Sequence, residues 1–312
     1  MDSHHQKGMS VQRRSLFALG AVLWAAAWPA RAAKPRAVAK ALQVEAVQMP
    51  AWAFAAGGRK LPLAPGMLIS TEQEVHTAEA AALALRMPEG SMIRLGENTR
   101  LGVLKMTVDP STGRTAVQAE LKLFDGVFRF ATGALAKVAG ERKIDVTLRT
   151  ATIGIRGTDF WSMTDEKHDA TCLFEGQVDL ATRDQGALTL DKPTAFWARF
   201  FEQPVRPVGN ATPDQLAQFL KSTELEPGKG VAVLDGRWRV VAATLADQGP
   251  ALELMRRLRD LGYPAMVREK SAQAGTGFEV RINGFVTRED AQAILRKIEG
   301  VPGVSGRVAL ST

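Results

Sequence analysis

The sequence predicts a multi-domain protein in which an all-β domain, a sandwich or a solenoid, precedes a smaller α+β domain. Residues 66–190 contain short alternating apolar runs separated by turn residues, which is typical of strands. Residues 231–312 combine two helical apolar stripes with strand-like segments. The intervening residues 191–230 are expected to form a linker with one short helix. This change of periodicity indicates two domains that fold independently.

Residues 1–33 have the pattern of an export signal rather than of folded structure. An arginine pair at 13–14 precedes an apolar run over 16–28, shorter than the ~20 residues that a membrane-spanning helix needs. A small-x-small site at 30–32 follows, so we expect cleavage near residue 33. The arginine pair is similar to a twin-arginine export motif. An ordinary secretory signal and an uncleaved signal anchor are the alternatives.

The charge of the chain argues against a nucleic-acid partner. The net charge is +7, and residues 1–33 contribute four basic residues and one acidic residue, so about +4 remains after cleavage. Proteins that bind nucleic acid normally present a concentrated basic face, which a charge this small does not indicate.

Catalytic and metal-binding patterns are not found. Beyond the signal the histidines are His76 and His168, and they are not spaced as metal ligands. Cys172 is the single cysteine, so no internal disulfide can form, and its apolar neighbours favour a small core residue over a reactive thiol. We therefore expect a protein that is not an enzyme and has no cofactor or metal site.

The β domain is expected to begin near Gly66. Residues 34–65 are rich in Ala, Pro and Gly, show little periodicity and are interpreted as a lead-in. Within the domain, residues 144–148 alternate as a strand does. Asp125-Gly126 and Glu175-Gly176 are expected turns.

Three segments of this domain resemble the FecR domain family, over about 66–180. They are Gly-Met-Leu-Ile-Ser-Thr at 66–71, a Leu-x-Leu-x-Asp-Gly step at 121–126 and Thr-Ala-Thr-Ile-Gly-Ile-Arg-Gly-Thr-Asp-Phe at 150–160. The last is similar to the family signature T-x-x-A-x-x-x-R-G-T-x-F. The resemblance implies a module that contacts the cell wall or an envelope protein partner. Because the family includes transmembrane regulators of sigma factors, an envelope signalling protein is the alternative function.

The C-terminal residues predict the element order β-α-β-β-α-β, the ferredoxin-like arrangement. A strand near 238–243 leads to a helix from about 249, and two strands follow at 265–269 and 278–283. A capping box at 287–290 begins the second helix, and a last strand ends the chain. Each helix has a single apolar stripe, so both should cover the same face of the sheet and leave the other face open.

This part resembles the SPOR family over about 231–312. The matching segments are Arg-Trp-Arg-Val-Val-Ala-Ala-Thr-Leu at 237–245, Leu-Arg-Asp-Leu-Gly-Tyr-Pro-Ala at 258–265 and Phe-Glu-Val-Arg-Ile-Asn-Gly-Phe at 278–285. The resemblance implies binding of peptidoglycan glycan strands that have lost their stem peptides. Val241 stands where the family usually has Gln, and Asn-Gly at 283–284 replaces a Gly-Pro pair.

The open sheet face is the candidate glycan-binding site. Its expected residues are Arg239, Val241, Thr244, Glu279 and Arg281. The arginines can donate hydrogen bonds to sugar hydroxyls or lactyl carboxylates; the alternative is that they are ordinary solvated charges. We therefore expect an exported periplasmic protein that binds glycan strands, concentrated at the division septum as many SPOR proteins are. A SPOR-like fold used for protein interaction is the alternative.

Overall fold

The computed structural model describes residues 40–55, 57–109, 116–133, 141–270 and 276–311. The expected export signal and its cleavage site lie outside these residues. In the described part of the chain, no helix has the length and apolarity needed to cross a membrane.

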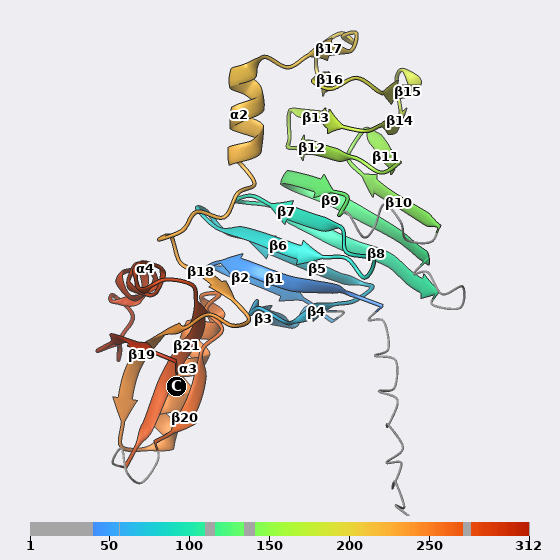
Figure 1. The fold of residues 1–312 in the computed structure, drawn as a ribbon. Coiled ribbons are helices and arrows are strands. Elements are labelled where there is room, and N and C mark those ends of the chain that lie inside the picture. The colour runs from blue at the N-terminus through green and yellow to red at the C-terminus, as the bar shows by residue number, and fades with distance from the viewer. Residues whose placement is uncertain (1–39, 56, 110–115, 134–140, 271–275, 312) are drawn as a thin grey trace, which may run out of the picture. The chain divides into compact units, whose positions relative to one another are not determined.

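Two β-sheets face each other over residues 42–210 (Figure 1). The first sheet contains, in spatial order, β4 (Leu68–Ile69), β1 (Leu42–Gln48), β6 (Ala82–Arg86), β7 (Met92–Leu95), the second half of β9 (Ala116–Ala131), β12 (Asp159–Thr164), β13 (His168–Glu175), β16 (Ala195–Phe200) and β17 (Gly209–Asn210). The second contains β3 (Lys60–Pro62), β2 (Ala51–Phe54), β5 (Gln73–Thr77), β8 (Arg100–Asp109), the first half of β9, β10 (Arg142–Thr147), β11 (Ala151–Ile155), β14 (Val178–Thr182) and β15 (Gly186–Leu190). The inward side chains of both sheets form one hydrophobic core, in which Phe128, Phe130 and Phe160 pack ring against ring. The all-β prediction for this part is confirmed.

The strand β9 corrects the expected turn at Asp125-Gly126. Residues 116–125 pair with β8 in the second sheet, and residues 126–131 pair with β12 in the first. The chain bends at Gly126, whose φ of +92° suits glycine, and a Cβ there would lie 2.3 Å from Thr99 Oγ1. The glycine therefore marks a corner where one strand passes between sheets, not a hairpin.

Two expected boundaries are also wrong. The lead-in over 34–65 contains β1, β2 and β3, and in β2 the small residues Ala51 and Ala53 face the core. The linker over 191–230 contains β16 and β17, and Trp197 of β16 is buried in the core. The short strands β2 and β3 and the aromatic strand β16 gave weak alternation signals, which is why the sequence placed them outside the domain.

The expected short helix is present as α2 (Pro213–Lys221), and it covers the outer face of the first sheet. Thr212 caps it in a capping box with Gln215. Phe219 stacks on Trp161 with ring centroids 4.0 Å apart, and Trp161 Nε1 donates to Ser222 Oγ. Cys172 lies in this apolar layer and is fully buried, and burial raises its pKa to about 12. The structure thus places Cys172 in a packing role.

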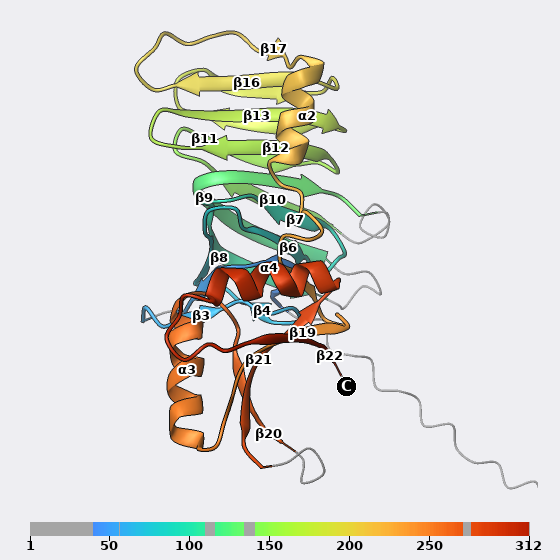
Figure 2. The same cartoon turned by 90° about the vertical axis from the view of Figure 1, so that its left-hand side faces the viewer.

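The C-terminal elements follow the expected order after a short additional strand. They are β18 (Val231–Val233), β19 (Trp238–Leu245), α3 (Gln248–Asp260), β20 (Met266–Glu269), β21 (Phe278–Phe285), α4 (Arg288–Ile298) and β22 (Arg307–Leu310). The antiparallel strand order is β22-β19-β21-β20. Both α3 and α4 contact β19 and β21 (Figure 2), and the buried residues Val240 and Ile282 of these strands share one core with the helices. One face of the sheet is therefore covered, as expected.

Backbone pairing joins the two parts of the chain, which the sequence analysis did not anticipate. The strand β18 pairs with β1 through Ala46 and Val233, and with β21 through Ala232 and Phe285. The amide N–H of Glu226 also donates to the side chain of Gln48, in a segment expected to be a plain linker. These contacts favour cooperative unfolding of the described residues over the expected independence of two domains.

Candidate glycan-binding face

The open face of the C-terminal sheet brings together the residues that the sequence singled out. In the register of β19 and β21, Val241 lies opposite Arg281, and Thr244 lies opposite Glu279. Arg239 lies opposite Asn283, one step further along the same face. The intervening pair, Val240 and Ile282, points into the core. The predicted alternation is confirmed for these strands.

Glu279 does not have the role that we expected for it. Only 3% of the residue is exposed, and its carboxylate accepts a hydrogen bond of 2.6 Å from Arg281 Nε and one of 3.1 Å from Arg307 Nη2. A carboxylate in this position is a shared counter-charge that holds two guanidinium groups side by side. It is buried because β21 lies between β19 and β20, whose side chains flank it on both sides. Glu279 therefore organises the site rather than contacting a ligand.

Val241 is also buried, at 1% exposure, so its expected ligand contact is wrong. The strand β19 lies between β21 and β22, and Val241 has Arg281 as its partner on one side and Arg307 on the other. The apolar stems of two such arginines readily cover a small side chain between them. Val241 supports the arginines, whereas Thr244 is exposed near the end of the strand.

Two arginines were missed by the sequence analysis. Arg307 lies on the last strand, with 59% of its side chain exposed, and Arg268 lies on β20 opposite Glu279. The alternation of Arg-Val-Ala-Leu at 307–310 was the available signal for Arg307, but its face depends on which strand β22 pairs with.

A groove of about 560 Å³ runs beside these arginines. Its lining includes Arg239, Arg268 and Arg281 together with the apolar residues Leu234 and Met266. Leu234 is 66% exposed and Met266 is 46% exposed, which is unusual for large apolar side chains. The groove thus combines fixed hydrogen-bond donors with apolar surface, although it holds no aromatic ring.

The electrostatics of the face favour a ligand rich in hydrogen-bond acceptors. Burial of the Arg239 guanidinium lowers the pKa of Arg239, and the neighbouring positive charge of Arg281 lowers it further, while Glu279 opposes the shift. Arginine stays protonated in proteins even with such a shift. Positive charge therefore accumulates here around a single buried carboxylate, and hydroxyl or carboxylate oxygens would relieve it.

The signature segment of the β domain, in contrast, stabilises turns. Thr158 Oγ1 donates to the carbonyl of Glu175 at 2.6 Å. Asp159 forms a two-pronged ion pair with Arg129, at 2.9 and 2.7 Å. Arg156 is 71% exposed along its side chain and pairs with Asp179. These contacts hold neighbouring strands and turns together and give the motif a structural role.

Two known protein families match separate parts of the chain. The model of the FecR protein family matches residues 73–179, and the SPOR domain model matches residues 234–305. The chain therefore contains a FecR domain and a SPOR domain, and both resemblances are confirmed. Both domains are typical of envelope proteins, and SPOR domains generally bind peptidoglycan.

Similarity to individual proteins is weak. No curated protein matches the chain. Two similar solved structures are crystal structures of candidate anti-sigma factors from Parabacteroides distasonis. The first is 15% identical, with a TM-score of 0.38, over 47% of this chain and 64% of that chain, so this chain spans less than two thirds of its length. The second is 11% identical, with a TM-score of 0.39, over 77% of this chain and 98% of that chain.

Proposed function

We propose that this is an exported, non-catalytic periplasmic protein that binds peptidoglycan glycan strands through the open face of its SPOR domain. In this proposal the SPOR domain has the ferredoxin-like fold. The observation that carries the proposal is the convergence of Arg239, Arg281 and Arg307 around the buried carboxylate of Glu279. The FecR domain would contact the wall or an envelope protein partner, and the chain would concentrate at the division septum.

The chemistry of the face suits a sugar chain without stem peptides. Glycan strands offer many hydroxyl acceptors and scattered lactyl carboxylates, which planar guanidinium groups bind well. Glu279 fixes the orientation of two of these groups in advance, so less side-chain entropy is lost when a ligand binds. Leu234 and Met266 would lie against the apolar faces of the sugar rings, in place of the missing aromatic ring.

Replacing Arg307 tests this proposal without removing a buried group. Arg307→Ala should weaken binding of amidase-treated glycan strands by about tenfold, which corresponds to one hydrogen bond to a charged group. Folding should change little, because Arg281 still pairs with Glu279. Binding is measured by co-sedimentation over a concentration series, and thermal melting reports stability.

The matched control is Arg256→Ala, which removes an exposed arginine from α3, on the covered side of the sheet. It should bind like the unaltered protein. Equal losses for the two variants would mean that general positive charge, not the arginine face, attracts the glycan.

A further inference from the structure

A second cationic site lies in the β domain, far along the chain from the SPOR face. A pocket of about 660 Å³ forms where β8 and β9 meet the turns after β10, β12 and β14 and the end of β16. Five basic side chains contribute to its lining: Arg100, Lys122, Arg149, Arg183 and Arg199. Its volume lies within the ~300–1,000 Å³ that is usual for ligand sites.

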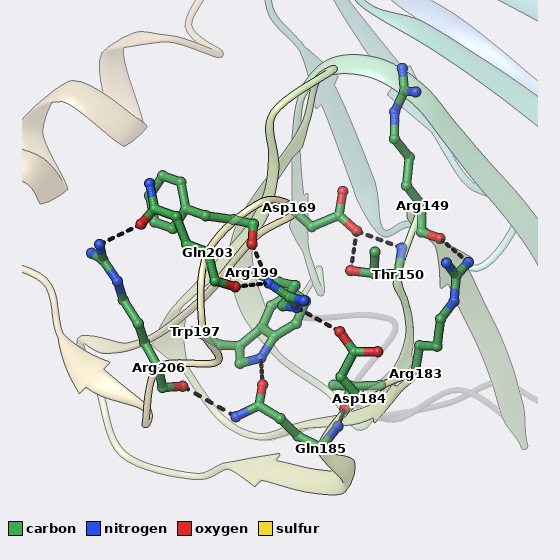
Figure 3. Close-up of polar contacts among 12 residues, drawn as sticks. Arg149, Thr150, Asp169, Arg183, Asp184, Gln185, Trp197, Arg199, Gln203 and Arg206 are labelled. Atoms are coloured by element: carbon green, nitrogen blue, oxygen red, sulfur yellow. Dashed lines mark hydrogen bonds and ion pairs between the residues drawn. The ribbon is translucent and has the colours of Figure 1, made fainter.

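Two of the five basic residues are neutralised within the pocket. Arg149 pairs with Asp125 at 2.5 Å, and Arg199 pairs with Asp184 at 2.7 Å. Arg199 is further fixed because it donates to the main-chain carbonyls of residues 200 and 203 (Figure 3). It therefore forms part of the pocket lining as an already paired side chain.

The remaining cations are held in place without full neutralisation. Arg183 donates to the main-chain carbonyl of Arg149 at 3.0 Å (Figure 3), and both residues contribute to the pocket lining. Lys122 and Arg100 both contact the ring of Phe124, at 4.7 and 4.6 Å from its centroid. Among the described residues, no carboxylate forms an ion pair with Lys122 or Arg183, and Arg100 reaches Glu74 only at 3.8 Å. The lining also includes the carboxylate of Glu166, so five basic side chains face three acidic ones. The pocket therefore carries a surplus of about two positive charges on side chains that are already positioned.

A buried carboxylate ties together the turn beside this pocket. The fully buried carboxylate of Asp169 accepts hydrogen bonds from the main-chain N–H and the hydroxyl of Thr150, at 2.6 and 2.7 Å, and from Thr164 Oγ1 at 2.5 Å. These bonds fix the turn that presents Arg149. Preorganised donors lose little entropy on binding and so favour a specific ligand over a diffuse ion atmosphere.

We propose that this pocket binds a short peptide through at least two carboxylates, with Lys122 and Arg183 as the main contacts. The cations come from separate strands and turns, so their charges are distributed along the pocket rather than focused on one point. The rings of Phe124 and Phe201 lie in the same lining and would contact apolar parts of a peptide. A compact inorganic anion would use neither feature. This inference does not depend on glycan binding by the SPOR domain.

Calorimetry with defined peptides on the purified protein tests the proposal. The probe is N-acetyl-Glu-Ala-Glu-amide, compared with its Gln-Ala-Gln counterpart and with inorganic phosphate. We expect the Glu peptide to bind, with an affinity that falls as salt is added, and the Gln peptide and phosphate to bind at least about tenfold more weakly. The double variant Lys122→Ala/Arg183→Ala should lose about tenfold or more in affinity for the Glu peptide.

The control variant is Arg156→Ala, which removes an exposed arginine from another part of the β domain. It should keep the affinity of the unaltered protein, and all variants should keep their affinity for glycan strands. A Glu peptide that fails to bind, binds no better than phosphate or the Gln peptide, or binds equally well to the double variant would overturn the proposal. If the double variant does not fold, Lys122→Gln alone replaces it under the same criteria.

Discussion

Replacing Asp290 with Ala is expected to destabilise the protein by about 3–5 kcal/mol, because several N–H donors lose a charged acceptor and each one left unsatisfied costs about 1–3 kcal/mol. Asp290 is fully buried at the start of α4. Its Oδ1 accepts hydrogen bonds from the N–H groups of Gly228, Gly230 and Val231, at 2.7, 3.0 and 2.9 Å. Its Oδ2 accepts one from Thr287 Oγ1 at 2.7 Å. Without the carboxylate, two buried N–H groups and one partly buried N–H group lose their acceptor.

The same variant should also loosen the junction between the two parts of the chain. The segment held by Asp290 continues directly into β18, which pairs with β1. We therefore expect faster proteolysis near residues 226–230 in Asp290→Ala, together with a lower urea midpoint. The neighbouring Glu289 is exposed, and Glu289→Ala is the matched control, with an expected change below about 0.5 kcal/mol. If both variants unfold at the same urea concentration, Asp290 does not anchor this segment.

Ile282→Ala is expected to cost about 2–5 kcal/mol, the range for truncating a large aliphatic side chain in a packed core. Ile282 is fully buried between the sheet and the helices of the SPOR domain. The adjacent Arg281 points to the opposite face, so its replacement by Ala should weaken glycan binding in addition to its effect on stability. Urea denaturation and glycan co-sedimentation of both variants measure the two effects separately.

The loss of folding stability expected for Arg281→Ala is larger than the loss usual for an exposed charge on a strand. Its removal leaves the buried carboxylate of Glu279 with Arg307 as its remaining arginine, so a loss of about 1–3 kcal/mol in stability is expected. If the folded Arg281→Ala variant binds glycan strands as tightly as the unaltered protein does, the assignment of Arg281 to the binding face is wrong.

The sequence predicted most of the SPOR domain because its signals are local. Alternation at 238–243 and 278–283 placed Val240 and Ile282 in the core, and the capping box at 287–290 located the start of α4. Such patterns need only the period of one strand or helix.

Features that depend on pairing between distant segments could not be predicted in the same way. Glu279 is buried because residues of β19, β20 and β22 meet around it, and the sequence of one strand does not reveal which neighbours will cover an acidic side chain. Asp125-Gly126 has the composition of a turn, and only the positions of β8 and β12 make it a corner within β9. The cationic pocket of the β domain likewise arises from turns that lie together only in the folded chain.

Co-sedimentation of the purified protein with peptidoglycan, before and after amidase treatment, tests the central claim most directly. Amidase removes stem peptides and leaves the sugar chain with its hydroxyls and lactyl carboxylates. If the arginine face binds glycan strands, binding should rise by about tenfold or more after treatment, and Arg239→Ala/Arg307→Ala should abolish the increase. Equal binding to both preparations, or an unchanged increase in the double variant, would contradict the account.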